Sequence, residues 1–192
     1  MSGNEVSINL NNGNKVILRE GQKGDQLTGD AKTMFNIFDV DNDGELSKME
    51  FSGAKDFSAG IFSIKESENQ TTVDYVEDTD KNTIPEYISR WVLDMKGRII
   101  DRIKDRDGDG KTDIHIAVTY NDNGEMNGQL TENFENGNLV SSEAFTEKNG
   151  ELLTRNIELD ENGEQVTQLT VPDGWSVKDA QDAFKELDNN KE

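Results

Sequence analysis

The stretch NDNGEMNGQLTENFENGNLVSSEAFTEKNGELLTRNIELDENG, residues 121–163, repeats one local pattern. Four of its five Asn-Gly pairs end at Gly124, Gly137, Gly150 and Gly163, with a constant spacing of 13 residues, and the Asn127-Gly128 pair is off this register. Asn and Gly both adopt the left-handed backbone conformation that tight hairpin turns require, and each intervening segment is long enough for one strand. We therefore expect an antiparallel β-meander in which one strand and one turn form one repeat.

The repeat extends towards the N-terminus through Gly110 and Gly97. Apolar and polar residues alternate clearly over residues 114–120 but more weakly in the later segments, so one face of the meander should be quite polar. The spacing of turns also resembles that of bacterial YD-type β-repeat proteins. The apolar face of such a sheet needs a cover.

Two predicted helices are the candidates for this cover. The first is capped by Thr83, has Pro85 in its first turn and ends at Gly97. The second begins after Ser176 and is followed by a C-terminal tail. Their apolar residues recur at helical spacing: Tyr87, Ile88, Trp91, Val92 and Met95 in the first, and Val177, Ala180, Ala183, Phe184 and Leu187 in the second.

The N-terminal part of the chain mixes strand and helix signals. Val6–Leu10 and Val16–Leu18 flank an Asn-Gly pair and indicate a β-hairpin. Two helices and two strands are expected after it: helices at Asp30–Phe38 and Ser47–Phe57, then strands at Ile61–Ile64 and Val73–Val76.

These signals predict an α+β fold, with an N-terminal EF-hand-containing region followed by an antiparallel β-meander covered by one or two helices. The expected domains are residues 1–96 (hairpin, EF-hand and amphipathic helix), 97–175 (meander with a calcium loop) and 176–192 (C-terminal helix and tail).

Composition narrows the classes of function. The 192 residues include 40 Asp and Glu, 20 Lys and Arg, and no Cys, for a net charge of −20. A surface this acidic repels nucleic acid and anionic lipid, and it attracts cations. Without Cys there is no disulfide framework, thiol nucleophile or Cys-ligated zinc site. No apolar run is long enough to span a membrane.

The loop Asp39–Glu50 has the side-chain pattern of a calcium site. Acidic side chains at its first, third and fifth positions can surround one ion, and Gly44 permits the sharp turn between them. The loop resembles that of the EF-hand family, and the resemblance covers residues 30–60. It predicts the following ligands: Asp39, Asp41, Asp43, the Glu45 carbonyl, Ser47 directly or through water, and bidentate Glu50.

EF-hands usually occur in pairs, and residues 77–84 lie where a partner loop is expected. Lys81 occupies a ligand position there, and Ile88 replaces the closing Glu. An ordinary turn is therefore favoured over a second EF-hand.

A second acidic loop spans Asp105–Asp113 and has acids at relative positions 1, 3, 5 and 9, with Gly110 at position 6. Its strand-like flanks resemble the calcium-binding hairpins of integrin-type β-propeller repeats, although one such motif cannot build a propeller. The resemblance implies Asp105, Asp107, Asp109, Asp113 and the Lys111 carbonyl as ligands. The alternative is an acidic hairpin that binds no ion.

The sequence thus predicts a non-enzymatic protein that binds two Ca²⁺ ions, which support a partner- or surface-binding β-sheet. The alternatives are a cytosolic calcium sensor or buffer, and a calcium-stabilised enzyme. No catalytic residue and no cofactor besides Ca²⁺ is expected, and the lone His115 should lie on the polar face in a structural role.

The expected partners are calcium ions and an unidentified protein or cell surface, with no nucleic acid and no membrane span. Residues 1–7 lack the features of a signal peptide. Millimolar extracellular calcium suits structural sites of modest affinity, which favours a secreted or surface location, with a cytoplasmic one as the alternative.

Overall fold

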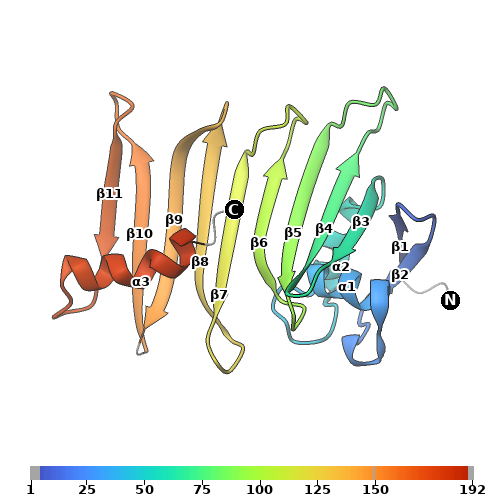
Figure 1. The fold of residues 1–192 in the computed structure, drawn as a ribbon, viewed down its shortest axis with the longest axis horizontal. Coiled ribbons are helices and arrows are strands. Elements are labelled where there is room, and N and C mark those ends of the chain that lie inside the picture. The colour runs from blue at the N-terminus through green and yellow to red at the C-terminus, as the bar shows by residue number, and fades with distance from the viewer. Residues whose placement is uncertain (1–4, 149, 190–192) are drawn as a thin grey trace. The chain divides into compact units, whose positions relative to one another are not determined.

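The computed structural model describes residues 5–148 and 150–189. These residues form eleven strands, three α-helices and one 3₁₀ helix. The strands belong to one sheet, in the order β11-β10-β9-β8-β7-β6-β5-β4-β3-β1-β2 (Figure 1). β1 and β3 run parallel, so the sheet is mixed.

This architecture corrects the expected fold class. The N-terminal region is not a separate EF-hand unit preceding a helix-covered meander, because its strands belong to the same large sheet as those of the meander. The helices are short and few among the described residues, with lengths of 10, 9 and 13 residues.

The chain divides into two compact units. Unit 1 comprises Met1–Ile99 with Arg106–Gly108, and unit 2 comprises Ile100–Asp105 with Asp109–Glu192.

Unit 1 contains the first five strands and two helices. The predicted N-terminal hairpin is present, with its Asn12-Gly13 turn between the first two strands. The bounds are β1 (Glu5–Leu10), β2 (Lys15–Arg19), η1 (Gly24–Gln26), α1 (Gly29–Phe38), α2 (Lys48–Asp56), β3 (Ile61–Glu66), β4 (Gln70–Glu77) and β5 (Tyr87–Asp94).

Aromatic side chains form the centre of the unit 1 core. Phe62 and Tyr75 lie 4.7 Å apart between ring centroids, and Phe57 contacts Trp91 edge-on at 5.5 Å. Met34 and Phe35 of α1 and Phe51 of α2 are also fully buried in this core. The two helices that flank the Asp39 loop are therefore anchored by apolar packing.

The prediction of an amphipathic helix before Gly97 is wrong, because residues 87–94 form strand β5. Burial there follows the two-residue period of a strand, with Ser89, Trp91 and Leu93 buried. Aromatic and β-branched residues suit this pleated environment, and β4 pairs with β5 along its whole length.

Unit 2 is the predicted meander. Its elements are nearly all of β6 (Ile99–Asp105), then β7 (Ile114–Tyr120), β8 (Met126–Glu135), β9 (Asn138–Lys148), β10 (Glu151–Leu159), β11 (Gln165–Thr170) and α3 (Val177–Asn189). All four repeat glycines have positive φ, from 78° at Gly163 to 87° at Gly124. These glycines therefore lie in the connections between successive strands, as the pattern predicts.

Helix α3 crosses one face of the meander (Figure 1). Ala180, Phe184 and Leu187 of the helix pack on the sheet residues Ala117, Leu130, Ala144 and Leu153. Arg155 fixes the helix further through two hydrogen bonds to Asp188, of 2.7 and 2.9 Å. Helix α3 thus packs on part of one face of unit 2.

The residues that alternate with this core point to the opposite face, which we call the open face. It carries Gln129, Thr131, Glu143, Phe145, Thr154 and Asn156, whose side chains are half-buried or exposed.

Candidate metal centres

The loop between α1 and α2 brings three of the predicted ligands together. Asp39, Asp41 and Asp43 each place a carboxylate oxygen within 4.8 Å of the other two. The loop backbone supports this arrangement, because the Gly44 amide donates to Asp39 Oδ2 at 3.2 Å and the Glu45 amide donates to Asp43 Oδ1 at 2.8 Å. Gly44 has a φ of 85°, which a residue with a side chain rarely adopts.

Asp39 is the buried member of this group, with only 5% of its surface exposed. Its Oδ1 has no hydrogen-bond partner among the described residues. Burial, followed by the nearby charge of Glu50, raises the pKa of Asp39 above its usual value. A cation would satisfy the unpaired oxygen and offset the repulsion among the acidic side chains.

Glu50 and Ser47 have a second role at the start of α2. The Ser47 hydroxyl accepts from the Glu50 amide at 3.3 Å, and Glu50 Oε2 accepts from the Ser47 amide at 2.9 Å, which forms a capping box. Glu50 Oε1 accepts from the Val40 amide at 2.7 Å. Burial alone would raise the pKa of Glu50, but these hydrogen bonds lower it overall. Glu50 thus closes the loop through backbone amides and is not grouped with the three Asp carboxylates.

The Asp39 loop pairs through its backbone with another segment, but this segment is not residues 77–84, which the sequence suggested as a partner. The Gly21 amide donates to the Leu46 carbonyl at 2.8 Å, and the Leu46 amide donates to the Gln22 carbonyl at 2.9 Å. The segment after β2 therefore pairs with the loop through its backbone. Residues 78–84 instead lie in the connection between β4 and β5, and Glu77 is the last residue of β4.

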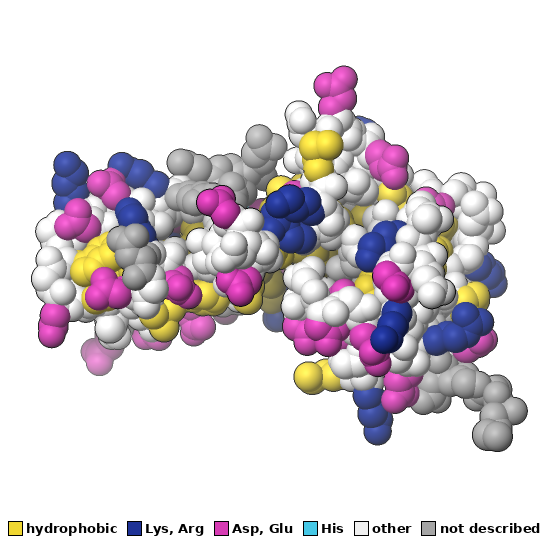
Figure 2. Space-filling view, turned by 90° about the horizontal axis from the view of Figure 1, so that it is seen from below, with side chains coloured by type: hydrophobic (Ala, Val, Ile, Leu, Met, Phe, Trp, Pro, Cys, Tyr) yellow, Lys and Arg dark blue, Asp and Glu magenta, His cyan; other side chains and the backbone are white. Residues whose placement is uncertain are grey.

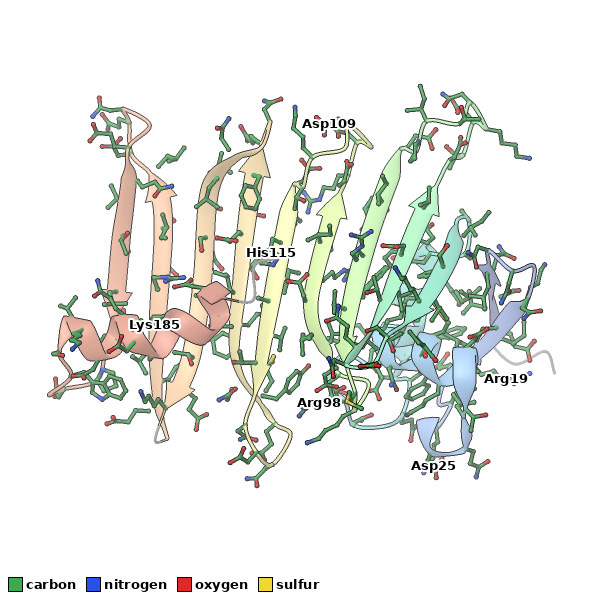
Figure 3. The ribbon with its side chains drawn as sticks, viewed as in Figure 1. Arg19, Asp25, Arg98, Asp109, His115 and Lys185 are labelled. Carbon is green, nitrogen blue, oxygen red and sulfur yellow. The ribbon has the colours of Figure 1, made fainter. Side chains whose placement is uncertain are left out.

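The second predicted site lies in the connection between β6 and β7, where Figure 3 labels Asp109. Oxygens of Asp105, Asp107 and Asp113 lie within 4.8 Å of one another, and Asp105 is 8% exposed. The Gly110 amide donates to Asp105 Oδ2 at 2.9 Å. Three of the four predicted carboxylates are therefore brought together.

Asp109 lies outside this group. Its Oδ1 accepts from the Lys111 amide at 2.8 Å, and its Oδ2 forms an ion pair with Lys111 Nζ at 3.1 Å. The hydrogen bond from the Lys111 amide, followed by the bond from its side chain, lowers the pKa of Asp109.

A third acidic group was missed from sequence. Asp78, Asp80 and Glu86, in the connection between β4 and β5, also bring oxygens within 4.8 Å. They occupy relative positions 1, 3 and 9, with Asn82 at position 5, as in the Asp105 loop. The Thr83 amide at position 6 donates to Asp78 Oδ2 at 2.9 Å, as the Gly110 amide does to Asp105. Comparing these residues with the β-hairpin pattern, rather than the EF-hand pattern, would have revealed the group.

His115 differs from the sequence expectation in its position on the sheet. It lies on β7, on the same face as the residues that pack against α3, and is 8% exposed (Figure 3). Its Nε2 lies 2.7 Å from Asp101 Oδ2, and its Nδ1 lies 3.0 Å from Glu132 Oε2. Burial alone would lower the pKa of His115, but hydrogen bonds to Asp101 and Glu132 raise it to about 9.

Figure 2 shows one side of the molecule with its acidic and basic side chains coloured separately. Asp and Glu side chains are spread there among Lys and Arg side chains. None of the described helices is long and apolar enough to cross a membrane.

A scan of protein-family models and a search of curated proteins found no match to this chain.

Proposed function

We propose that the protein binds Ca²⁺ at the Asp39 loop and at the Asp105 loop, and that the ions stabilise the fold. The observation that carries the proposal is the buried carboxylate of Asp39, whose Oδ1 has no hydrogen-bond partner among the described residues and which is grouped with the carboxylates of Asp41 and Asp43. Hard carboxylate oxygens in a flexible loop suit Ca²⁺ better than Mg²⁺, which demands a small octahedral shell.

A structural role is favoured over a sensor role by the surroundings of the Asp39 loop. Sensor EF-hands open on binding calcium and expose an apolar groove. Here Phe35, Phe38 and Phe51, from the helices on either side of the loop, are buried in the unit 1 core. Opening the two helices would remove these side chains from that core.

The test is a calorimetric titration of the chelator-treated protein with Ca²⁺. We expect two ions per chain, because the ligand sets of the two loops share no residue. Asp41→Asn with Asp43→Asn should remove one binding event, and Asp105→Asn with Asp107→Asn should remove the other.

Asp78→Asn with Asp80→Asn serves as a matched control, and it should leave both events intact. One ion in the wild-type protein would eliminate the Asp105 site. Submicromolar affinity would favour the sensor or buffer alternative over structural sites.

A further inference from the structure

The open face of unit 2 is hollowed between β8, β9 and β10. The hollow has a volume of about 270 Å³. Two rungs of directly opposed residues line it: Gln129, Phe145 and Thr154 in one, and Thr131, Glu143 and Asn156 in the other. Neighbouring strands lie about 4.8 Å apart, so these six side chains form a compact two-by-three grid.

The lining is nearly uncharged, although the chain as a whole is strongly acidic. Glu143 is the single ionisable side chain among the six, in a protein with a net charge of −20. The other polar groups are amides and hydroxyls, which can both donate and accept hydrogen bonds. This combination matches an uncharged ligand rich in hydroxyl groups better than it matches an anion or a cation.

The hydrogen-bonding capacity of the hollow is largely unused. Among the described residues, the side chains of Glu143, Thr154 and Asn156 form no hydrogen bond or ion pair. Gln129 Nε2 donates only to the Thr131 hydroxyl, at 3.3 Å. These groups therefore remain available to a ligand lying across the strands.

Phe145 supplies an apolar surface at the centre of the first rung. Its side chain is half-buried, and α3 lies on the opposite face. The face of an aromatic ring is negatively polarised and attracts the C–H groups of a sugar ring, while the surrounding amides and hydroxyls bond to the sugar hydroxyls.

We propose that the open face binds a neutral glycan, with one sugar ring stacked on Phe145 and bonded to Glu143, Thr154 and Asn156. This inference names the partner of the predicted surface-binding sheet. It does not depend on calcium binding, because none of the candidate metal ligands lies on the open face.

The experiment measures binding of neutral hexasaccharides to the full chain by calorimetry and by amide chemical shifts in NMR. The probes are a β-linked glucan, an α-linked glucan and a mannan, each at millimolar concentration. We expect at least one to bind and to shift the amides of Gln129, Phe145 and Thr154.

Two variants locate the site. Phe145→Ala and Asn156→Ala should each weaken binding by about three- to tenfold, the range expected for losing one ring contact or one hydrogen bond. Thr167→Ala is the matched control, because Thr167 is exposed on β11 but pairs with Ile157 on the other face of the sheet. It should bind like the wild-type protein. Asn156 is exposed and forms no side-chain bond, so its variant tests the site even if Phe145→Ala fails to fold.

Several results would overturn the proposal: no binding of any of the three glycans, equal binding by both variants, or preferential binding of heparin. A dimer that Phe145→Ala converts to a monomer would instead identify the face as a contact between copies of the chain. The titrations are repeated in chelator on protein shown to be folded. Loss of calcium binding with retained glycan binding would contradict the proposed function alone.

Discussion

At the scale of single residues, Asp39 is both buried and incompletely hydrogen-bonded. Its carboxylate is nearly closed off from water, yet one oxygen has no partner among the described residues. The raised pKa means that the ionised form costs folding free energy when no cation is bound, and this cost grows as pH rises above the ordinary Asp range.

We therefore expect Asp39→Asn to raise the melting temperature in chelator by a few degrees. The substitution removes the charge and keeps the shape, and the new amide can donate to Asp41 or Asp43. It should also abolish the stabilisation that calcium provides at this loop. Thermal unfolding in chelator and in calcium measures both effects.

Asp41→Asn is the control, because Asp41 is exposed. This substitution should change the melting temperature in chelator little, and it should abolish the rise in melting temperature that calcium produces at this loop. A melting temperature of Asp39→Asn below that of the wild-type protein in chelator would contradict this account.

His115 should make the stability of unit 2 depend on pH. Its pKa in the folded state is about 9, above the usual 6.5, so the imidazolium bonded to Asp101 and Glu132 stabilises the fold. This contribution is complete below about pH 6.5 and is lost as pH rises through about 9. It should amount to roughly 3–4 kcal/mol, since each pKa unit corresponds to about 1.4 kcal/mol.

We expect the wild-type free energy of unfolding, measured with urea in chelator, to fall over that pH window. His115→Gln should remove most of the slope and lower stability mainly at the acidic end. Parallel pH curves for the two proteins would show that the imidazolium contributes nothing.

At the scale of elements, the Asp39 loop is joined to the segment after β2 by the bonds between Leu46, Gly21 and Gln22. An ion that orders the loop should therefore order that segment too. We expect calcium to slow hydrogen exchange at the Gly21 and Leu46 amides. The Gly163 amide, bonded to the Asp160 carbonyl in the turn between β10 and β11, should exchange at an unchanged rate. Slowing confined to residues 39–50 would contradict the coupling.

Elements whose signals are local were predictable from the sequence. The Asp39 loop depends on the spacing of its own side chains, and the meander turns depend on Asn-Gly pairs. Strand β5 was not predictable in this way, because the apolar residues at 87, 88, 91, 92 and 95 fit a helical period. Pairing with β4 and burial of Trp91 against Phe57 and Phe62 decide for the strand, and both contacts are distant in sequence.

The acidic group of Asp78, Asp80 and Glu86 was also not predictable from the local pattern of an EF-hand. Glu86 joins Asp78 and Asp80 because a hairpin connection returns the chain to its starting edge. The EF-hand pattern requires a closing acid in a following helix, so it does not detect an acidic group that forms in the connection between two strands.

At the scale of the whole molecule, a large negative charge opposes compaction, and bound cations reduce it. Binding only to the folded state adds about 2.7 kcal/mol per site at a hundredfold excess of ion over Kd. We expect the melting temperature to rise clearly from chelator to millimolar Ca²⁺, and to rise less with equal Mg²⁺. Superimposable unfolding curves in chelator and calcium would exclude structural calcium sites.

The meander also restricts how such a chain can change length over evolution. Each strand of unit 2 pairs only with its immediate neighbours, and β11 leads from one end of the sheet into α3. An in-frame duplication of one 13-residue repeat would reverse the direction of the last strand, so that the chain would leave the sheet at the opposite end from α3. Duplication of two repeats restores the direction. Homologous chains that keep the covering helix should therefore differ by even numbers of strands.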